Sequence, residues 1–82
     1  MYSLKFEKQA TKQLAKLEKD DKERIWNKLQ DCKLDPFHYV EHLEDIEGFK
    51  LRVGDFRLIV DIDTKNQVIT ILKVGNRRNV YD

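Results

Sequence analysis

The segment Phe49–Val60 constrains the fold of this chain more than any other part of the sequence. It consists of two apolar-rich runs, FKLRV and FRLIV, joined by Gly54-Asp55. A two-residue loop that begins with glycine, between runs of this kind, is typical of a β-hairpin with a type I′ or type II′ turn. We therefore expect two antiparallel strands, over residues 49–53 and 56–62.

The expected pairing separates apolar from basic side chains. Side chains alternate between the two faces of a strand, so one face of the hairpin carries Phe49, Leu51, Val53, Phe56, Leu58 and Val60. The other face carries Lys50, Arg52 and Arg57, with Arg52 directly opposite Arg57. Like charges at opposed positions destabilise a sheet, and a sheet that keeps them is typical of a surface that meets a polyanion such as phosphate. A solvated face, on which the long side chains spread apart at little cost, is the alternative that the sequence leaves open.

The rest of the chain predicts a single α+β domain over residues 1–82. Residues 2–6 alternate as a short strand, and apolar residues at helical spacing follow in two groups, Ala10, Leu14 and Leu17 and then Ile25, Leu29 and Cys32. The second group predicts a helix over residues 21–33, with Asp20 as its N-cap. We expect residues 34–47 to form a loop with room for one helical turn.

After Gly48 the hydrophobic period changes from helical to alternating, as in strands. Beyond the hairpin, a polar turn leads into a last strand over residues 67–74, which is apolar on both faces and is therefore expected to be central rather than at an edge. Gly75 is expected to end it. The resulting order, β-α-α-β-β-β, predicts a helical hairpin packed on one face of a mainly antiparallel sheet, with the strand order left open.

Charge and composition narrow the classes of function. The 82 residues carry a net charge of +1, but residues 34–47 contain five acidic and no basic side chains, while residues 1–33 and 48–82 each carry a balance of +3. A typical nucleic-acid-binding protein is far more basic, so any phosphate site must be local.

With no apolar run of membrane-spanning length and no signal-peptide pattern, we expect a cytoplasmic protein without a membrane partner. The single cysteine, Cys32, lies on an apolar helix stripe and is expected to be a buried small hydrophobe.

The C-terminal segment adds a second group of candidates. Arg77, Arg78 and Tyr81 follow the predicted central strand. Together with the hairpin cations they suit metal-independent RNA cleavage, in which the ribose 2′-hydroxyl attacks its own phosphate and guanidinium groups stabilise the charge that develops on the phosphoryl oxygens. Proton transfer would require Tyr81 or Lys50 with a pKa lowered by neighbouring cations. A solvated tail and a tyrosine that anchors the chain end are the alternatives.

The sequence predicts neither a metal site nor a cofactor site. The two histidines, His38 and His42, are four residues apart, a spacing that would allow metal ligation on a helix. No clear third ligand accompanies them, although Glu41 and Glu44 are near in sequence, and polar loop positions are the more ordinary explanation. P-loop, zinc-knuckle, catalytic-triad and dinucleotide-binding patterns are absent.

The sequence resembles the RelE/ParE toxin superfamily, and its RelE branch in particular. The resemblance is carried by LRVGDFRLIV, residues 51–60, and ILKVGNRRNVY, residues 71–81, which match the G-[DN]-[YF]-R and V-G-x-R-x-x-V-Y patterns of that family. It extends over essentially the whole chain, with less specific helices, and implies a RelE-like fold. It also implies the toxin of a type II toxin–antitoxin system. RelE-type members cut mRNA on the ribosome without metal and thereby inhibit translation, so the implied partners are a RelB-like antitoxin, the ribosome and mRNA.

Carried over residue by residue, the resemblance assigns catalytic roles to Lys50, Arg52, Arg57, Arg77 and Tyr81. Lys50 and Arg52 match two basic strand positions at which lysine is familiar in RelE. Arg52 is therefore a departure, which can hold phosphate but is a poorer proton-transfer group. Tyr81 matches the tyrosine proposed as general base, although the segment between Gly75 and Tyr81 is shorter here.

Two other functions remain open at this point. A ParE-like member would share the fold but bind DNA gyrase, and it would not need the cations and the tyrosine, whose presence favours the nuclease. A non-catalytic module would use the basic face only to bind an acidic antitoxin. In the nuclease interpretation, Lys73 and Arg78 are expected to add further contacts with RNA.

Overall fold

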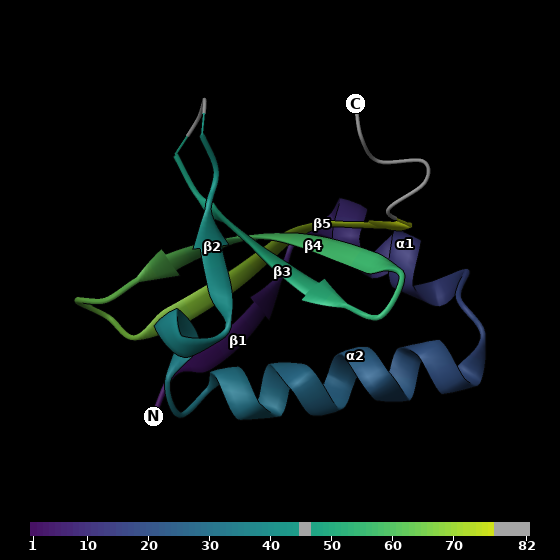
Figure 1. The fold of residues 1–82 in the computed structure, drawn as a ribbon, viewed down its shortest axis with the longest axis horizontal. Coiled ribbons are helices and arrows are strands. Elements are labelled where there is room, and N and C mark those ends of the chain that lie inside the picture. The colour runs from purple at the N-terminus through teal and green to yellow at the C-terminus, as the bar shows by residue number, and fades with distance from the viewer. Residues whose placement is uncertain (45–46, 77–82) are drawn as a thin grey trace.

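The computed structural model describes residues 1–44 and 47–76 of the chain (Figure 1). Its helices are α1 Lys8–Ala15, α2 Lys19–Cys32 and the 3-10 helix η1 Pro36–His38. Its strands are β1 Ser3–Phe6, β2 Val40–His42, β3 Phe49–Val53, β4 Phe56–Asp63 and β5 Val68–Asn76. The strands form one five-stranded sheet in the order β1-β5-β4-β3-β2, in which the β1–β5 pair is parallel and the other pairs are antiparallel. The predicted α+β class and mainly antiparallel sheet are confirmed.

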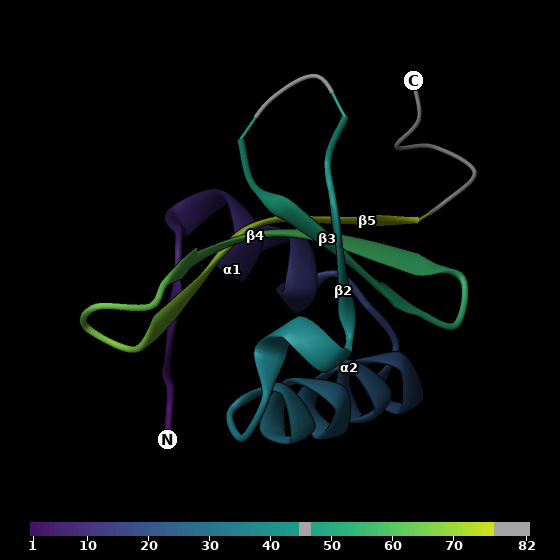
Figure 2. The ribbon, with the colours of Figure 1, turned by 60° about the vertical axis from the view of Figure 1, so that its left-hand side comes forward.

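The helices and the sheet enclose one hydrophobic core. α2 lies below the sheet in both Figure 1 and Figure 2, while α1 packs against β5. The core combines one face of the sheet with the predicted helix stripes, and its largest fully buried side chains are Ile25, Leu29, Leu51, Leu58, Ile69, Ile71, Val60 and Cys32. None of the helices in the described ranges is long and apolar enough to cross a membrane.

The β3–β4 hairpin has the predicted register. Arg52 pairs with Arg57, and Leu51 pairs with Leu58. The two leucines are 1% and 0% exposed, so the apolar face is the one that enters the core. Gly54 has a φ of 59°, whereas Asp55 does not have a positive φ, which is the pattern of a type II′ turn.

The start of α2 differs from the prediction. The helix begins at Lys19, with Glu18 in the N-cap position and no side-chain capping bond, so the assignment of Asp20 as N-cap is wrong. Asp20 and Asp21 instead lie within the first turn. Acidic side chains there interact favourably with the positive end of the helix dipole, so these residues stabilise the start of the helix from inside it.

The segment 34–47 contains more structure than the predicted loop. The expected helical turn is η1, but β2 follows it and pairs antiparallel with β3, with Glu41 opposite Lys50 and His42 opposite Phe49. β2 has three residues, which is too few for an alternating pattern to distinguish a strand from a loop. The sheet therefore has one more strand than the sequence predicted.

β5 lies between β1 and β4, as its apolar sequence predicted, but it does not end at Gly75. It continues to Asn76, and Gly75 pairs with Arg57. The register also shifts within the strand, because Ile59 pairs with Lys73 while the next residue, Val60, pairs with Ile71. Leu72 is thus an extra residue, a β-bulge that reverses the alternation of β5 beyond it.

Candidate functional site

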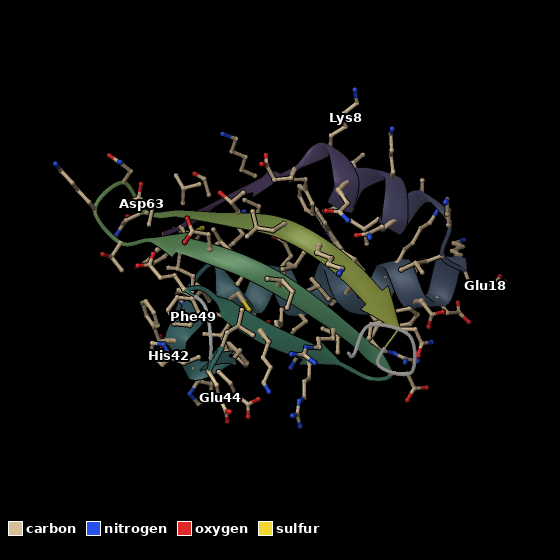
Figure 3. All side chains as sticks on the ribbon, turned by 90° about the horizontal axis from the view of Figure 1, so that it is seen from above. Lys8, Glu18, His42, Glu44, Phe49 and Asp63 are labelled. Atoms are coloured by element: carbon tan, nitrogen blue, oxygen red, sulfur yellow. The ribbon has the colours of Figure 1, made fainter. Side chains whose placement is uncertain are left out.

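Two neighbouring rows of cross-strand pairs gather cations on the face of the sheet opposite α2, which we call the open face. One row runs from β2 to β5 through Glu41, Lys50, Ile59 and Lys73, and the other runs through Arg52, Arg57 and Gly75. Figure 3 views the sheet from this side, with α2 behind the strands. Rows two residues apart along a strand are separated by about 7 Å, and neighbouring strands by about 5 Å. The open face therefore places Lys50, Arg52, Arg57 and Lys73 within one small area.

The exposure of these side chains fits a surface that is accessible to an anion. The side chain of Arg52 is 53% exposed and that of Lys50 is 23% exposed. Arg57 is half-buried, with its Nε atom shielded from water, and Lys73 is exposed. Long basic side chains commonly pack their stems and keep their charged ends at the surface. Neither Arg52 nor Arg57 enters the core, so the prediction that they face each other on the outer side of the hairpin is confirmed.

Glu41 is a member of this group that the sequence did not identify. Its Oε1 atom lies 3.6 Å from Nζ of Lys50 and 3.7 Å from Nε of Arg52. Both distances are those of ion pairs rather than of hydrogen bonds. Since the Glu41 side chain is 57% exposed, such pairs are worth only about 0–1 kcal/mol each. The carboxylate therefore lies among the phosphate-binding candidates without adding much to the stability of the fold.

The predicted residues of the C-terminal segment, Arg77, Arg78 and Tyr81, lie outside the described residues. The last described residue, Asn76, pairs with Phe56, next to the pair of Gly75 and Arg57. Of the predicted site residues, the described structure thus brings together Lys50, Arg52, Arg57 and Lys73.

The two histidines contact aromatic rings. The ring of His42 lies 4.7 Å from that of Phe49, which in turn contacts Phe37 at 5.5 Å, and His38 lies 4.7 Å from Tyr39. His42 and Phe49 lie side by side in Figure 3. They belong to the pair next to Glu41 and Lys50, so their side chains point to the other face of the sheet. Across residues 1–44 and 47–76, no three His, Cys, Asp or Glu side chains are grouped as a metal site.

Cys32 and Trp26 are both separate from the open face. Cys32 is 1% exposed and burial raises the pKa of its thiol to about 11, with smaller effects from Lys28, which lowers it, and Asp31, which raises it. A buried thiol of this kind is a poor nucleophile at neutral pH, so the expected packing role is consistent with the structure. Trp26 is 53% exposed beside an apolar hollow of about 340 Å³ on the helix side of the molecule, whose walls include Phe6, Leu14 and Leu29.

Comparisons with known proteins agree on one group of relatives. The ParE toxin family of type II toxin–antitoxin systems, parDE, matches residues 4–81. A RelE-like toxin protein of Escherichia coli is 29% identical over 86 aligned residues, which cover 99% of this chain and 90% of the relative. A chain of the archaeal RelE–RelB complex from Pyrococcus horikoshii superposes with a TM-score of 0.82 at 29% identity, covering 96% of this chain and 98% of that one. A chain of the RelBE2 toxin–antitoxin complex from Mycobacterium tuberculosis superposes with a TM-score of 0.74 at 28% identity, covering 93% and 98%.

Proposed function

This chain belongs to the ParE toxin family of type II toxin–antitoxin systems, and we propose that it is a metal-independent endoribonuclease that cuts mRNA on the ribosome. It is a RelE-like toxin in sequence and in fold. The observation that carries the nuclease proposal is the gathering of Lys50, Arg52, Arg57 and Lys73 on the open face by two rows of cross-strand pairs. Opposed cations weaken a sheet, so their position is best explained by a bound polyanion.

In this proposal the cations act on the scissile phosphate. Lys50, Arg52 and Arg57, together with Arg77, hold the phosphate while the ribose 2′-hydroxyl attacks the phosphorus. Guanidinium groups suit this task because their planar arrangement of donors matches two phosphoryl oxygens at once. Tyr81 or Lys50 takes part in proton transfer, and Lys73 and Arg78 hold neighbouring parts of the RNA.

A ParE-like toxin that binds DNA gyrase is the second candidate, because the family that matches this chain is named for ParE. Such a toxin would share the fold without needing cations gathered at one phosphate. The two candidates differ in what happens to the cell first: the nuclease leaves gyrase active and cuts mRNA, and the gyrase inhibitor leaves mRNA intact.

We also propose a RelB-like antitoxin as the partner that holds this toxin in the cytoplasm, where ribosomes and mRNA are found. The two solved complexes described above join RelE-type toxins with their antitoxins. A partner that brings acidic and apolar side chains to the open face would neutralise Lys50, Arg52 and Arg57. Association should then be fast and should slow as salt is added, because complementary charge acts largely on the encounter rate.

The test is cleavage of a defined mRNA by the purified toxin with and without ribosomes, with both new ends mapped. Replacing Arg57 with alanine should lower the cleavage rate by roughly 10²–10³, as expected when a donor that stabilises the transition state is lost. Lys65→Ala is the matched control, because Lys65 is an exposed cation in the β4–β5 turn, at the far end of β4 from Arg57. It should cleave at the wild-type rate.

Tyr81→Phe separates chemistry from packing in the same assay, because it removes the hydroxyl and keeps the ring. A large loss of rate would assign proton transfer to Tyr81, and an unchanged rate would leave Lys50. Growth arrest with intact mRNA and inhibited gyrase would reject the nuclease in favour of the ParE-like function.

A further inference from the structure

We propose that Glu41 is the general base of RNA cleavage and that Lys50, its cross-strand partner, is the general acid. The inference rests on the nuclease function proposed above and adds a residue that the family patterns in the sequence do not contain. It starts from the pairing of β2 with β3, which sets Glu41 directly opposite Lys50 and brings its carboxylate to Arg52 as well.

The contacts of the Glu41 carboxylate leave it able to accept a proton. The ion-pair contacts of Lys50 and Arg52 are both with the same oxygen, Oε1, at 3.6 and 3.7 Å. An ionised carboxylate only accepts hydrogen bonds and has room for about four, so a ribose hydroxyl can bind to it without displacing either cation. Asp61 is an acid on the same face of β4, but among the described residues only Glu41 forms ion pairs with Lys50 and Arg52.

The position of the carboxylate relative to a bound phosphate follows from the same distances. A phosphate held by Lys50 must approach Nζ, and one held by Arg52 binds its guanidinium group; Nζ of Lys50 and Nε of Arg52 both lie within 4 Å of Glu41. In RNA the attacking 2′-hydroxyl is on the sugar carbon next to the one that bears the phosphate. A phosphate that binds these cations on the side of Glu41 would therefore bring its own 2′-hydroxyl toward the carboxylate, as a general base requires.

The proton and bond changes balance within this pair. Glu41 takes the proton of the 2′-hydroxyl as the bond from 2′-oxygen to phosphorus forms, and Lys50 donates a proton to the 5′-oxygen as the bond from phosphorus to that oxygen breaks. The products are a 2′,3′-cyclic phosphate and a 5′-hydroxyl end. Glu41 is then a carboxylic acid beside a neutral Lys50 amine, and transfer of one proton across this contact restores the starting pair.

Carboxylates and ammonium groups suit the two halves of this proton transfer. A carboxylate is already ionised and ready to accept a proton, and an ammonium group is ready to donate one. A tyrosine or lysine acting as base would first have to lose its proton, which needs a strongly shifted pKa. The pair of Glu41 and Lys50 supplies a proton acceptor and a proton donor within one ion pair.

The first experiment compares Glu41→Gln with Glu44→Gln in single-turnover cleavage on the ribosome. Glu44 is an exposed acid of the same segment, three residues away, and the described structure shows no ion pair between it and Lys50 or Arg52. Glu41→Gln should cleave roughly 10²–10⁴ times more slowly, as for loss of a general base, while Glu44→Gln keeps the wild-type rate. Binding of an mRNA with a 2′-deoxy nucleotide at the cleavage site should be unchanged or tighter in Glu41→Gln, because a negative charge has been removed.

The second experiment separates the two roles. In an mRNA with sulfur in place of the 5′-oxygen at the scissile bond, the leaving group departs without protonation. This substrate should restore most of the rate of Lys50→Ala, but it should leave Glu41→Gln as slow as before, since the 2′-hydroxyl still needs a base.

The possible failures are distinguishable. If the wild-type protein does not cleave mRNA at all, the proposed nuclease function fails. A second outcome is that wild type cleaves, Arg57→Ala is slow, and Glu41→Gln cleaves as fast as wild type or faster. The nuclease function would then stand, and Glu41 would be only an anion that competes with phosphate for the cations. If the sulfur substrate does not restore Lys50→Ala, the assignment of Lys50 as general acid is wrong.

Discussion

Replacing Cys32 with alanine should reduce the loss of stability of this protein at alkaline pH. Cys32 is 1% exposed at the C-terminal end of α2, and burial raises the pKa of its thiol from 9.0 to about 11. In the unfolded chain the thiol is in water and keeps its ordinary pKa. As the pH rises, the unfolded state therefore loses this proton first, which favours unfolding.

The sign and size of the effect follow from the two pKa values. The stabilising contribution of the protonated thiol is fully present below pH 9 and is lost as the pH rises through about 11. A difference of two pKa units corresponds to a loss of about 3 kcal/mol in the free energy of unfolding. About half of that loss, roughly 1.4 kcal/mol, is reached at pH 10.

The measurement is urea unfolding followed by far-ultraviolet circular dichroism, for wild type and Cys32→Ala, at pH 7 and at pH 10. At pH 7 the variant should be less stable by about 1 kcal/mol because a small buried group has been removed. At pH 10 this difference should vanish or reverse. Lysines and tyrosines that titrate in the same range occur in both proteins and largely cancel in the comparison. An equal difference between the two proteins at both pH values would refute the reasoning, since it would mean that the buried thiol does not set the pH dependence.

Three further predictions concern the packing that supports the open face. Leu58→Ala should lower the free energy of unfolding by about 2–5 kcal/mol, because Leu58 is 0% exposed; a loss well below this range in urea unfolding would mean that the site collapses around the smaller side chain. Gln13→Met should cost about 1–3 kcal/mol, because the side chain of Gln13 accepts the N–H of Val74 at 2.7 Å, and hydrogen exchange of that amide should accelerate, whereas unchanged exchange would contradict the role of this bond. Gly54→Ala should lower the melting temperature, because Gly54 has a φ of 59° and an added Cβ would lie 2.8 Å from Nη1 of Arg24; adding Arg24→Ala should recover part of the loss, and full recovery would show that the turn itself tolerates alanine.

The parts of the fold that could be predicted are those in which two independent signals agree. In the hairpin, the glycine-led loop and the alternation of apolar and basic residues both demand that Arg52 face Arg57, and they do. The stripe of Ile25, Leu29 and Cys32 likewise lies on one side of a helix, so these residues can be buried together only if that side packs on the sheet, as it does. Such agreement between local and long-range preferences is what makes a sequence specify one structure.

The parts that could not be predicted depend on pairings that leave little trace in the local sequence. β2 is too short for its alternation to be recognised, so Glu41 was assigned to a loop and its approach to Lys50 was not foreseen. The site predicted from basic residues and family patterns contains the cations that hold the phosphate and Tyr81 as a candidate base, but it does not contain Glu41. The proximity of the Glu41 carboxylate to Lys50 becomes visible only when β2 is placed beside β3.

The bulge at Leu72 is explained by the charge of Lys73, although no glycine, proline or other turn residue at this position predicts it. With unbroken alternation, Lys73 would follow Ile69 and Ile71 into the core, where an unpaired charge is very costly. The extra residue instead leaves Ile69, Ile71 and Val74 buried and turns Lys73 outward, opposite Ile59 on the open face. It also aligns Gly75 with Arg57, so that the neighbouring strand adds no side chain beside that guanidinium in its row. The bulge in β5 therefore allows three apolar side chains to be buried while Lys73 stays exposed. As a result, the basic surface extends from β3 and β4 to a third strand, β5.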